Sequence, residues 1–286
     1  MTQLERVRKA NAVRERVSAW RSAGDRVALV PTMGNLHAGH LCLIERAREL
    51  ADRVIVSIFV NPTQFGPQED IQNYPRTPVE DEALLARQGC TDLLFVPSEQ
   101  EIYPHGTADI VTVKLPGLAN DLCGRFRPGH FDGVASVVLR FLNIAQPDFL
   151  VMGQKDYQQL TLLTRMLDEL HVSTELVTTA TVREPDGLAM SSRNQYLTPE
   201  ERQLAPQLHA TLAELAIDLQ RDGAAFEARR SAALEELVRQ GFRPDYLELR
   251  HADDLSMAEA TGFGRARILL VAAWLGRARL IDNLLV

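Results

Sequence analysis

The sequence contains few cysteines, the residues that form disulfides and zinc knuckles. Of its 286 residues only three are cysteines, Cys42, Cys90 and Cys123, and no two of them form a C-x-x-C pair. An odd number of widely spaced cysteines indicates neither a disulfide framework nor a zinc knuckle. The cysteine content therefore favours a reducing, cytoplasmic compartment.

Long apolar runs are also absent. The longest stretches, such as residues 54–60, have the length of a β-strand and fall far short of the roughly 20 residues that span a membrane. The first 17 residues carry charges throughout and lack the apolar core of a signal peptide. We therefore expect neither a membrane segment nor export.

Lysine is scarce, and acidic residues outnumber basic ones. The 31 Lys and Arg residues against 38 Asp and Glu residues give a net charge of −7, and only Lys9, Lys114 and Lys155 among the cations are lysines. An acidic chain is poorly suited to coat nucleic acid or to bind an anionic membrane. With 45% hydrophobic and 24% charged residues, the composition is otherwise that of an ordinary globular protein.

The spacing of apolar residues predicts two domains. Up to about residue 182, predicted strands alternate with predicted helices, which is typical of a parallel sheet covered on both faces. The strands are expected at 27–31, 53–60, 92–97 and 148–153. The helices are expected at 3–22, 77–89, 133–145 and 155–170, and a further helix after the first strand ends near residue 51. A long helical stretch from residue 198 and strands at 245–250, 267–275 and 278–286 follow. We expect an α/β domain over residues 1–182 and a smaller α+β domain over residues 183–286.

The most informative motif follows the first predicted strand. Residues 31–40 read PTMGNLHAGH and place His37 and His40 at a strand-to-helix turn, where α/β proteins bind ligands. Gly34 lets the backbone bend, and N–H groups at the start of the helix can hold phosphate. A single histidine here is more often structural, and a His-x-x-His pair can be half of a metal site, but no carboxylate or cysteine ligand accompanies it. Two glycines and two histidines together favour stabilisation of charge on a phosphate.

Two further motifs offer polar groups for a small acid. Asn61 and Gln64, after the second strand, are uncharged hydrogen-bonding residues suited to hydroxyls and a carboxylate, although alone N-P-x-Q-F is more often a turn. Arg127 and His130, in the glycine-rich loop before residue 133, could meet a carboxylate, because arginine pairs with both of its oxygens. A solvated surface loop explains this second motif about equally well.

Two more motifs suit phosphate. Lys155 follows Gly153 at the start of a predicted helix, where the helix dipole disfavours a cation by ~0.3–1 kcal/mol, so an anionic partner would explain its position. Ser191, Ser192 and Arg193 offer two hydroxyls and a guanidinium, which are groups suited to phosphate oxygens. Alone, this last stretch would be better explained as a polar interdomain loop.

Together these motifs resemble a known family. The H-x-G-H turn is similar to the signature of the HIGH nucleotidyltransferase superfamily, and all five motifs, across nearly the whole chain, resemble the pantoate–β-alanine ligase (pantothenate synthetase) family. The resemblance implies a Rossmann-like first domain, a second domain that closes over ATP as a lid, and a cytoplasmic homodimer. The implied reaction is ATP-dependent condensation of pantoate with β-alanine through a pantoyl adenylate, with Mg²⁺ held by phosphate oxygens and water rather than by an all-protein metal site.

The resemblance also implies residue roles. The catalytic residues would be His40, His37, Lys155 and Arg193. The ATP site would comprise Met33, Gly34, Asn35, Leu36, His37, Ala38, Gly39, His40, Gly153, Gln154, Lys155, Asp156, Val182, Met190, Ser191, Ser192 and Arg193. Pantoate and β-alanine would contact Gln64, Gln159, Asn61, Arg127 and His130. Similar proteins carry glutamate where this chain has Gln154, so a charge is lost beside the retained lysine.

Two alternatives have testable consequences. Another adenylyl transferase of the superfamily would form a dinucleotide or charge tRNA, but a tRNA enzyme should present a basic face or an anticodon domain. A non-catalytic nucleotide-binding regulator would bind ATP without releasing pyrophosphate when pantoate is added. The presence of His37, His40, Lys155 and Arg193 together argues against this second alternative.

Overall fold

The computed structural model describes residues 4–67, 69–261 and 264–286, which form two compact units. The first unit comprises the chain up to Gln154 together with Leu162–Ala180, and the second comprises Lys155–Thr161 together with Thr181–Val286. A single boundary near residue 182 does not anticipate that the short segment beginning at Lys155 groups with the second unit.

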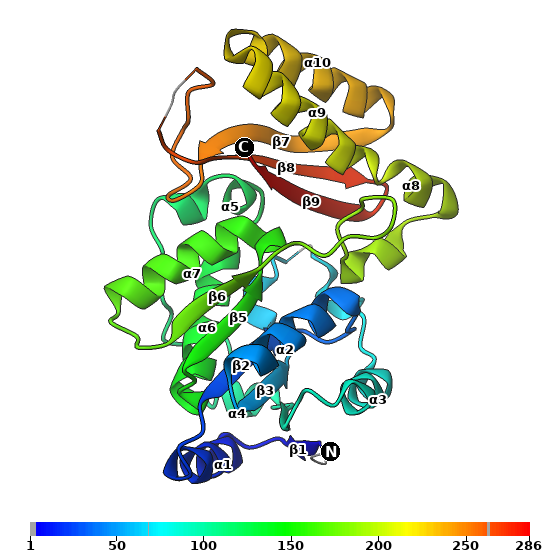
Figure 1. Cartoon of the computed structure of the whole chain (residues 1–286). Coiled ribbons are helices and arrows are strands. Elements are labelled where there is room, and N and C mark those ends of the chain that lie inside the picture. Colours follow the sequence, from blue (N-terminus) through cyan, green and yellow to red (C-terminus); the bar gives the residue numbers. More distant parts are fainter. Residues whose placement is uncertain (1–3, 68, 262–263) are drawn as a thin grey trace. The chain divides into compact units, whose positions relative to one another are not determined.

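A six-stranded parallel sheet forms the centre of the first unit, with strand order β1-β4-β3-β2-β5-β6 (Figure 1). Its strands are β1 (Glu5–Val7), β2 (Val27–Thr32), β3 (Arg53–Ile58), β4 (Leu93–Phe95), β5 (Phe149–Gly153) and β6 (Glu175–Thr179). Its helices are α1 (Ala10–Ser22), α2 (Ala38–Leu50), α3 (Pro78–Gln88), α4 (Glu99–Ile102), α5 (Cys123–Phe126) and α6 (His130–Ala145), and α7 (Tyr157–Glu169) begins in the segment assigned to the second unit. Short 3₁₀ turns are η1 (Pro62–Gln64), η2 (Asp70–Gln72), η3 (Leu118–Asn120) and η4 (Gln154–Asp156). The predicted parallel α/β architecture is confirmed.

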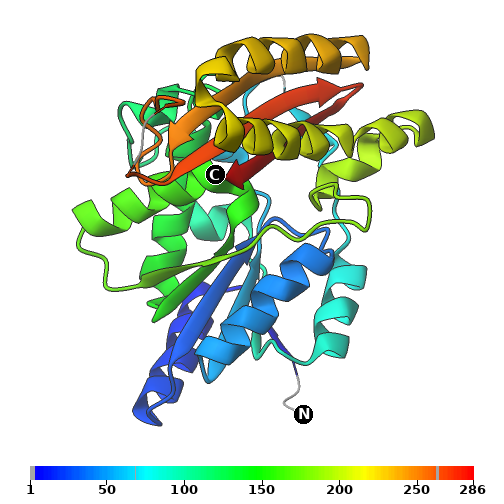
Figure 2. The same cartoon turned by 45° about the horizontal axis from the view of Figure 1, so that its top comes forward.

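Burial on both faces explains why the central strands are continuous apolar runs. In β2, Ala28 and Val30 pack with Ile44 and Ala47 of α2 in one core cluster, while alternate residues such as Leu29 are buried on the opposite face. Figures 1 and 2 show α2 in front of the sheet and α6 behind it. Right-handed crossover connections place helices on both faces in this way.

Two edge strands depart from the predicted elements. The helical spacing predicts one helix over residues 3–22, but Glu5–Val7 pairs with β4, and α1 begins only at Ala10. The pairing is fixed by the backbone bonds Glu5 N to Asp92 O (3.1 Å) and Val96 N to Val7 O (2.9 Å). The sequence does not predict β6, because its residues are half-buried or exposed and do not form a continuous apolar run.

The carboxyl ends of β3, β2 and β5 lie side by side, since these are neighbouring parallel strands. The register pairs Thr32 with Ile58, and Phe59 N continues the ladder to Thr32 O at 3.0 Å. Segments far apart in the sequence, 33–40, 59–65 and the turn at Gly153, therefore leave the sheet at one edge. This is the edge at which parallel sheets bind ligands.

The second unit contains the antiparallel sheet β7-β8-β9, formed by β7 (Phe242–His251), β8 (Arg267–Leu275) and β9 (Ala278–Leu285). Its helices are α8 (Pro199–Leu204), α9 (Gln207–Arg221) and α10 (Phe226–Arg239), with 3₁₀ turns η5 (Ser192–Tyr196) and η6 (Gly223–Ala225). Leucines of α9, among them Leu212, pack in one cluster with Leu269 and Val271 of β8. A capping box begins α8, since the side chains of Thr198 and Glu201 each accept a hydrogen bond from the other residue's backbone N–H group. Within the described ranges, no helix combines the length and the apolar character needed to cross a membrane.

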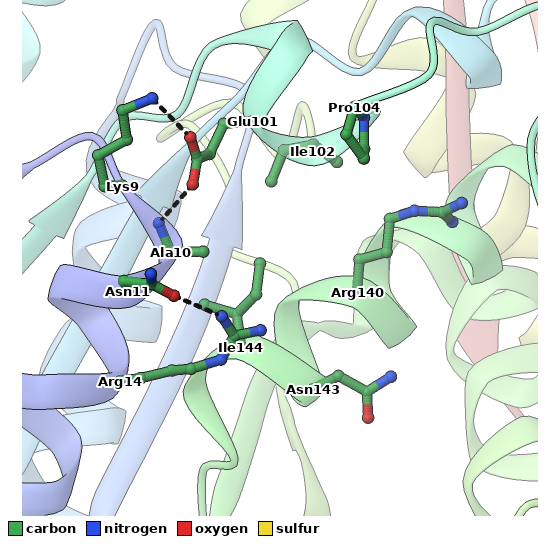
Figure 3. A pocket seen from close by; sticks show the side chains of 10 residues that line it. All are labelled: Lys9, Ala10, Asn11, Arg14, Glu101, Ile102, Pro104, Arg140, Asn143 and Ile144. Atoms are coloured by element: carbon green, nitrogen blue, oxygen red, sulfur yellow. Dashed lines mark hydrogen bonds and ion pairs between the residues drawn. The ribbon is translucent and has the colours of Figure 1, made fainter.

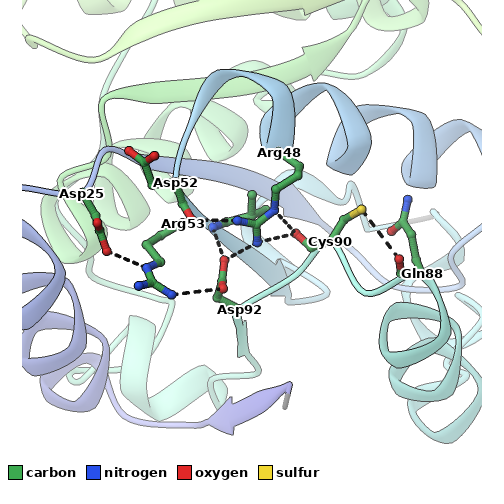
Figure 4. Close-up of polar contacts among 8 residues, drawn as sticks. Asp25, Arg48, Asp52, Arg53, Gln88, Cys90 and Asp92 are labelled. Carbon is green, nitrogen blue, oxygen red and sulfur yellow. Dashed lines mark hydrogen bonds and ion pairs between the residues drawn. The ribbon is translucent and has the colours of Figure 1, made fainter. Parts of the chain in front are cut away.

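A charge cluster ties the amino ends of β3 and β4 together (Figure 4). The buried carboxylate of Asp92 pairs with Arg48 and accepts a bond from Val54 N at 2.8 Å. Arg53 Nη1 lies 3.6 Å from the same carboxylate, and its Nε donates to Asp25 at 2.7 Å. Because these residues lie at the amino edge of the sheet, their role in this structure is to stabilise the strands.

We expect Asp92→Ala to lower the free energy of unfolding by about 2–3 kcal/mol, because a buried N–H and two arginines lose their acceptor. The estimate lies below that for a fully buried pair because both arginines are about a third exposed. Denaturant unfolding of the two proteins measures the change. Glu49→Ala is the control, since the Arg46–Glu49 pair is exposed and should change stability little. Equal midpoints for the two variants would contradict the prediction.

Candidate active site

The turn after β2 is held by a buried carboxylate from another helix. Asp81, in the first turn of α3 and 2% exposed, accepts hydrogen bonds from Asn35 N (2.9 Å) and Leu36 N (2.8 Å). Gly34 and Asn35 have positive φ angles of 82° and 51°, and a Cβ on Gly34 would lie 3.1 Å from Asp81 Oδ2. The glycine is therefore required both by the backbone and by the close approach of Asp81.

The two histidines cap the helix that they begin. His37 is the N-cap residue of α2, and its Nδ1 accepts a hydrogen bond from Gly39 N at 3.2 Å. In return, His40 Nδ1 accepts from His37 N at 3.3 Å, and the ring centroids lie 4.1 Å apart. A ring nitrogen that accepts a hydrogen bond carries no proton, so each neutral ring holds its proton on Nε2. Both imidazoles are thus set as Nε2–H donors at the carboxyl edge of the sheet.

The segment after β3 forms a closed network of amides. Asn61 is 1% exposed, and its Nδ2 donates to Gly133 O (3.2 Å) and Gln64 Oε1 (3.0 Å). Its Oδ1 accepts from Tyr103 Oη at 2.6 Å, and burial raises the pKa of Tyr103, so the phenol stays protonated as a donor. Gln64 Nε2 then points to Met33 Sδ at 3.3 Å, a weak acceptor that a substrate oxygen could replace. Gln64, rather than Asn61, has an amide group available for a ligand.

Arg127 and His130 are brought together, but the arginine already has a carboxylate partner. Arg127 Nε and Nη2 donate to Glu69 at 2.9 and 2.6 Å, and its Nη1 donates to His130 Nε2 at 2.9 Å. His130 Nδ1 in turn donates to Gln64 O at 2.8 Å. This chain of contacts connects the loop before α6 to the Gln64 segment. A substrate carboxylate would reach the Arg127 guanidinium only by competing with Glu69.

A separate cleft of about 630 Å³ in the first unit is lined by α1, α4 and α6 (Figure 3). Its charged groups bond mainly to the protein. Lys9 Nζ pairs with Glu101 at 2.9 Å, and Arg140 donates to the carbonyl groups of Ser136 and Val111 while lying over the Tyr103 ring. The cleft therefore offers a ligand fewer unengaged charges than its composition suggests.

In the second unit, the predicted phosphate-binding segments share one small cavity of about 10 Å³, lined in part by Lys155, Ser191, Asn194, His209 and Asp282. Ser191 is the N-cap of η5, and its Oγ accepts from Arg193 N at 3.2 Å. Asn194 Nδ2 donates to Ala189 O at 3.1 Å, which fixes the start of this turn. Gln159 lies further along α7, in the same unit.

A buried ion pair lies beside this cavity. Arg183 Nη1 and Nη2 bond the two oxygens of Asp282 at 2.6 and 2.9 Å, and His209 Nδ1 lies 3.4 Å from the same carboxylate. Burial alone would raise the pKa of Asp282, but the nearby His209 ring and the two hydrogen bonds from Arg183 outweigh it and hold that pKa below its ordinary value. Asp282 is therefore a carboxylate at neutral pH. In the parts of the chain that the structure describes, no group of three or more His, Cys, Asp or Glu side chains is arranged to hold a metal ion.

The chain is similar in sequence to proteins of known function. The sequence profile described as pantoate–β-alanine ligase matches residues 5–285. The chain belongs to this family. Pantothenate synthetases of Shewanella amazonensis and Thioalkalivibrio sulfidiphilus are each 50% identical to it, over 95% and 98% of this chain and 95% and 97% of the relatives.

Solved structures agree with this assignment. Pantothenate synthetase from Thermus thermophilus matches with a TM-score of 0.88 and 42% identity over 98% of both chains. Pantoate–β-alanine ligase from Francisella tularensis, complexed with β,γ ATP and β-alanine, matches with a TM-score of 0.79 and 33% identity, over 99% of this chain and 97% of that one. The enzyme class and the two-domain fold expected from the motifs are confirmed.

Several residues that shape the site are missed by the sequence analysis. Asp81 belongs to no motif: Thr77, the residue before α3, makes no side-chain cap, and its Oγ1 donates instead to Asp81 Oδ1 at 3.1 Å. Tyr103 and Asp282 lie outside every motif. Gly153 is not required by its turn, because an added Cβ would meet Leu43 Cδ2 at an ordinary 3.8 Å.

Proposed function

We propose that the two Nε2–H donors of His37 and His40 stabilise the phosphoryl group of ATP while this ligase forms pantothenate in two half-reactions. The tautomer fixed by the reciprocal helix cap is the observation that carries the proposal. Rings held by the backbone act as preorganised donors and need no reorganisation when charge develops in the transition state. His40 is assigned the main catalytic role, with His37 beside it.

In the first half-reaction, a carboxylate oxygen of pantoate attacks the α-phosphorus of ATP. A bond forms from that oxygen to phosphorus, the bond to the bridging oxygen breaks, and pyrophosphate leaves with the electron pair. Lys155, Ser191, Ser192 and Arg193 are assigned to the β- and γ-phosphates, because an ammonium, two hydroxyls and a guanidinium are the groups that bind such oxygens. The remaining ATP contacts are assigned to segments 33–40 and 153–156, Val182 and Met190.

In the second half-reaction, the amine of β-alanine attacks the acyl carbon of the pantoyl adenylate, and AMP leaves. Both nucleophiles belong to substrates, so the protein positions reactants and stabilises charge. Gln64 Nε2 is suited to a hydroxyl or carboxylate oxygen of pantoate, and Gln159 is assigned to the same substrate. Asn61, Arg127 and His130 are assigned to shaping this end of the site, through the contacts that they make with Gln64 and Glu69.

Three further assignments rest on the family and on chain chemistry. ATP is taken to bind as its magnesium complex, with the ion held by phosphate oxygens and water, as is usual for Mg²⁺. A homodimer follows from the family resemblance. The cytoplasm is proposed because Cys42, Cys90 and Cys123 are all free thiols.

An omission assay tests the proposed function. With ATP, pantoate and β-alanine present, we expect equal amounts of AMP and pyrophosphate. With β-alanine omitted, pyrophosphate should form in a single burst of about one per active site, because the adenylate waits for its amine. With pantoate omitted, neither product should form. Pyrophosphate release without pantoate, or a dinucleotide product, would instead favour another adenylyl transferase.

A further inference from the structure

The second unit contains a polar cluster, made of Arg183, His209, Asp282 and Asn283, that no motif includes. It lies next to both segments assigned to the phosphates of ATP. Asp282 and Asn283 are adjacent on β9 and are 4% and 3% exposed. Burying a polar group costs free energy unless the group is hydrogen-bonded. The hydrogen-bond partners of Asp282 and Asn283 therefore indicate which segments β9 holds in place.

Arg183 connects Asp282 to the loop that carries Ser191. Residues 182–190 form a hairpin, closed by Met190 N to Val182 O (3.0 Å) and by Glu184 N to Leu188 O (2.8 Å). Besides its two bonds to Asp282, Arg183 Nη1 donates to Gly187 O at 3.1 Å, at the tip of the hairpin. The Arg183 guanidinium thus connects the tip of the hairpin, as well as the hairpin strand that carries Arg183, to β9.

His209 supports the same hairpin from α9. A Cβ added to Gly187 would lie 3.2 Å from His209 Cδ2, and Gly187 has a φ of 94°, so the tip packs closely against the ring. The residues that follow the hairpin are Ser191, Ser192 and Arg193. Asp282, through Arg183 and beside His209, therefore holds the hairpin from which this segment leaves.

Asn283 connects the same strand to the lysine segment. Its Nδ2 donates to the backbone oxygen of Lys155 at 2.9 Å. Tyr157, two residues further on, donates from its hydroxyl to Ala252 O at 2.9 Å. The backbone of the segment beginning at Lys155 is thus fixed to the sheet of the second unit, and Lys155 lines one cavity with Ser191 and Asp282.

We propose that Asp282 and Asn283, together with Arg183, are positioning residues that align the Lys155 segment with residues 191–193 as one preformed pyrophosphate-binding half-site. The inference rests on the proposed function, in which these two segments bind the β- and γ-phosphates. Asp282 acts on residues 191–193 through Arg183 and the hairpin. Asn283 acts on Lys155 by binding the backbone oxygen of that lysine. None of the three positioning residues is assigned a contact with ATP.

The test compares Asp282→Asn with the native ligase. An amide offers one acceptor oxygen instead of two, so the fork of Arg183 is released and the hairpin loses its fixed direction. We expect kcat/KM for ATP to fall about tenfold to a hundredfold, as for a misplacement of about 1 Å, with the KM for pantoate unchanged. The inhibition constant of inorganic pyrophosphate, which probes the half-site directly, should rise in parallel.

Two further variants separate positioning from folding. Glu248→Gln is the matched control, because it weakens another mostly buried ion pair, with Arg250, in the same sheet. It should lower the melting temperature without changing pyrophosphate inhibition. The double variant Arg183→Met with Asp282→Leu removes both charges, which often preserves stability, and should remain folded while pyrophosphate binding stays weak.

The outcomes distinguish this inference from the proposed function. If Lys155→Ala and Arg193→Ala leave both ATP kinetics and pyrophosphate inhibition unchanged, the assignment of the phosphate site itself fails. If those variants lose activity but Asp282→Asn shows only the melting shift of Glu248→Gln, the positioning role is overturned. Recovery of native pyrophosphate inhibition in the double variant would also overturn it, because packing alone would then suffice.

Discussion

Replacing His40 by alanine is expected to slow pantoate-dependent pyrophosphate release about a hundredfold to a thousandfold, or 2.7–4 kcal/mol in the barrier, as for one preorganised donor. The loss should appear in kcat, because the Nε2–H is used most where charge develops in the transition state. Lys155→Ala should have an effect of similar size. Quenched-flow measurement of the first turnover, with β-alanine absent, isolates this step.

The alanine variant also removes half of the reciprocal cap, so a control must preserve that bond. His40→Asn keeps an acceptor for His37 N but does not extend to the position of Nε2. We expect His40→Asn to retain nearly native stability and still lose most of the rate. If both His40 variants and Lys155→Ala release pyrophosphate at the native rate, the roles of His40 and Lys155 in adenylation are wrong.

The fold could be predicted where burial leaves a pattern in the local sequence. The apolar runs of β2, β3 and β5 reflect helices on both faces of the sheet, so the parallel architecture and the sheet edge that carries the candidate site followed from the sequence. By contrast, residues 5–7 have helical spacing, and only pairing with the distant β4 makes them a strand. β6 has no apolar run because the structure leaves it partly exposed.

The candidate site also contains residues that a local pattern predicts and residues that it does not. His37 and His40 are recognisable because residue type and spacing along a short segment are sufficient to identify them. Asp81 is separated from Asn35 by 46 positions, and Asp282 is separated from Arg183 by 99. Contacts over such distances depend on how the sheet and hairpins assemble, and no local pattern encodes them. Residues of a short motif are thus easier to predict than the distant residues that hold the motif in place.

Asp81 is the clearest case, and its removal has the second largest expected effect. Asp81→Asn leaves one acceptor oxygen for the N–H groups of Asn35 and Leu36, so one of these partly buried donors loses its partner. Because the donors are only partly buried, this should lower stability by about 1–2 kcal/mol. Because the turn leads directly into His37 and His40, kcat/KM for ATP should fall about a hundredfold, as for a misplacement of about 1 Å.

The neighbouring residue supplies the control for this prediction. Glu80 lies in the same first turn of α3 but is exposed, so Glu80→Gln changes the charge of the helix start without affecting the turn. Thr77→Val removes only the third bond to Asp81 and should have an intermediate effect. Single-turnover kinetics in moderate ATP excess, with unfolding curves for each variant, measure both consequences. Asp81→Asn could lower the free energy of unfolding and still adenylate pantoate at the native rate. That result would mean that the carboxylate stabilises the fold without orienting the histidines.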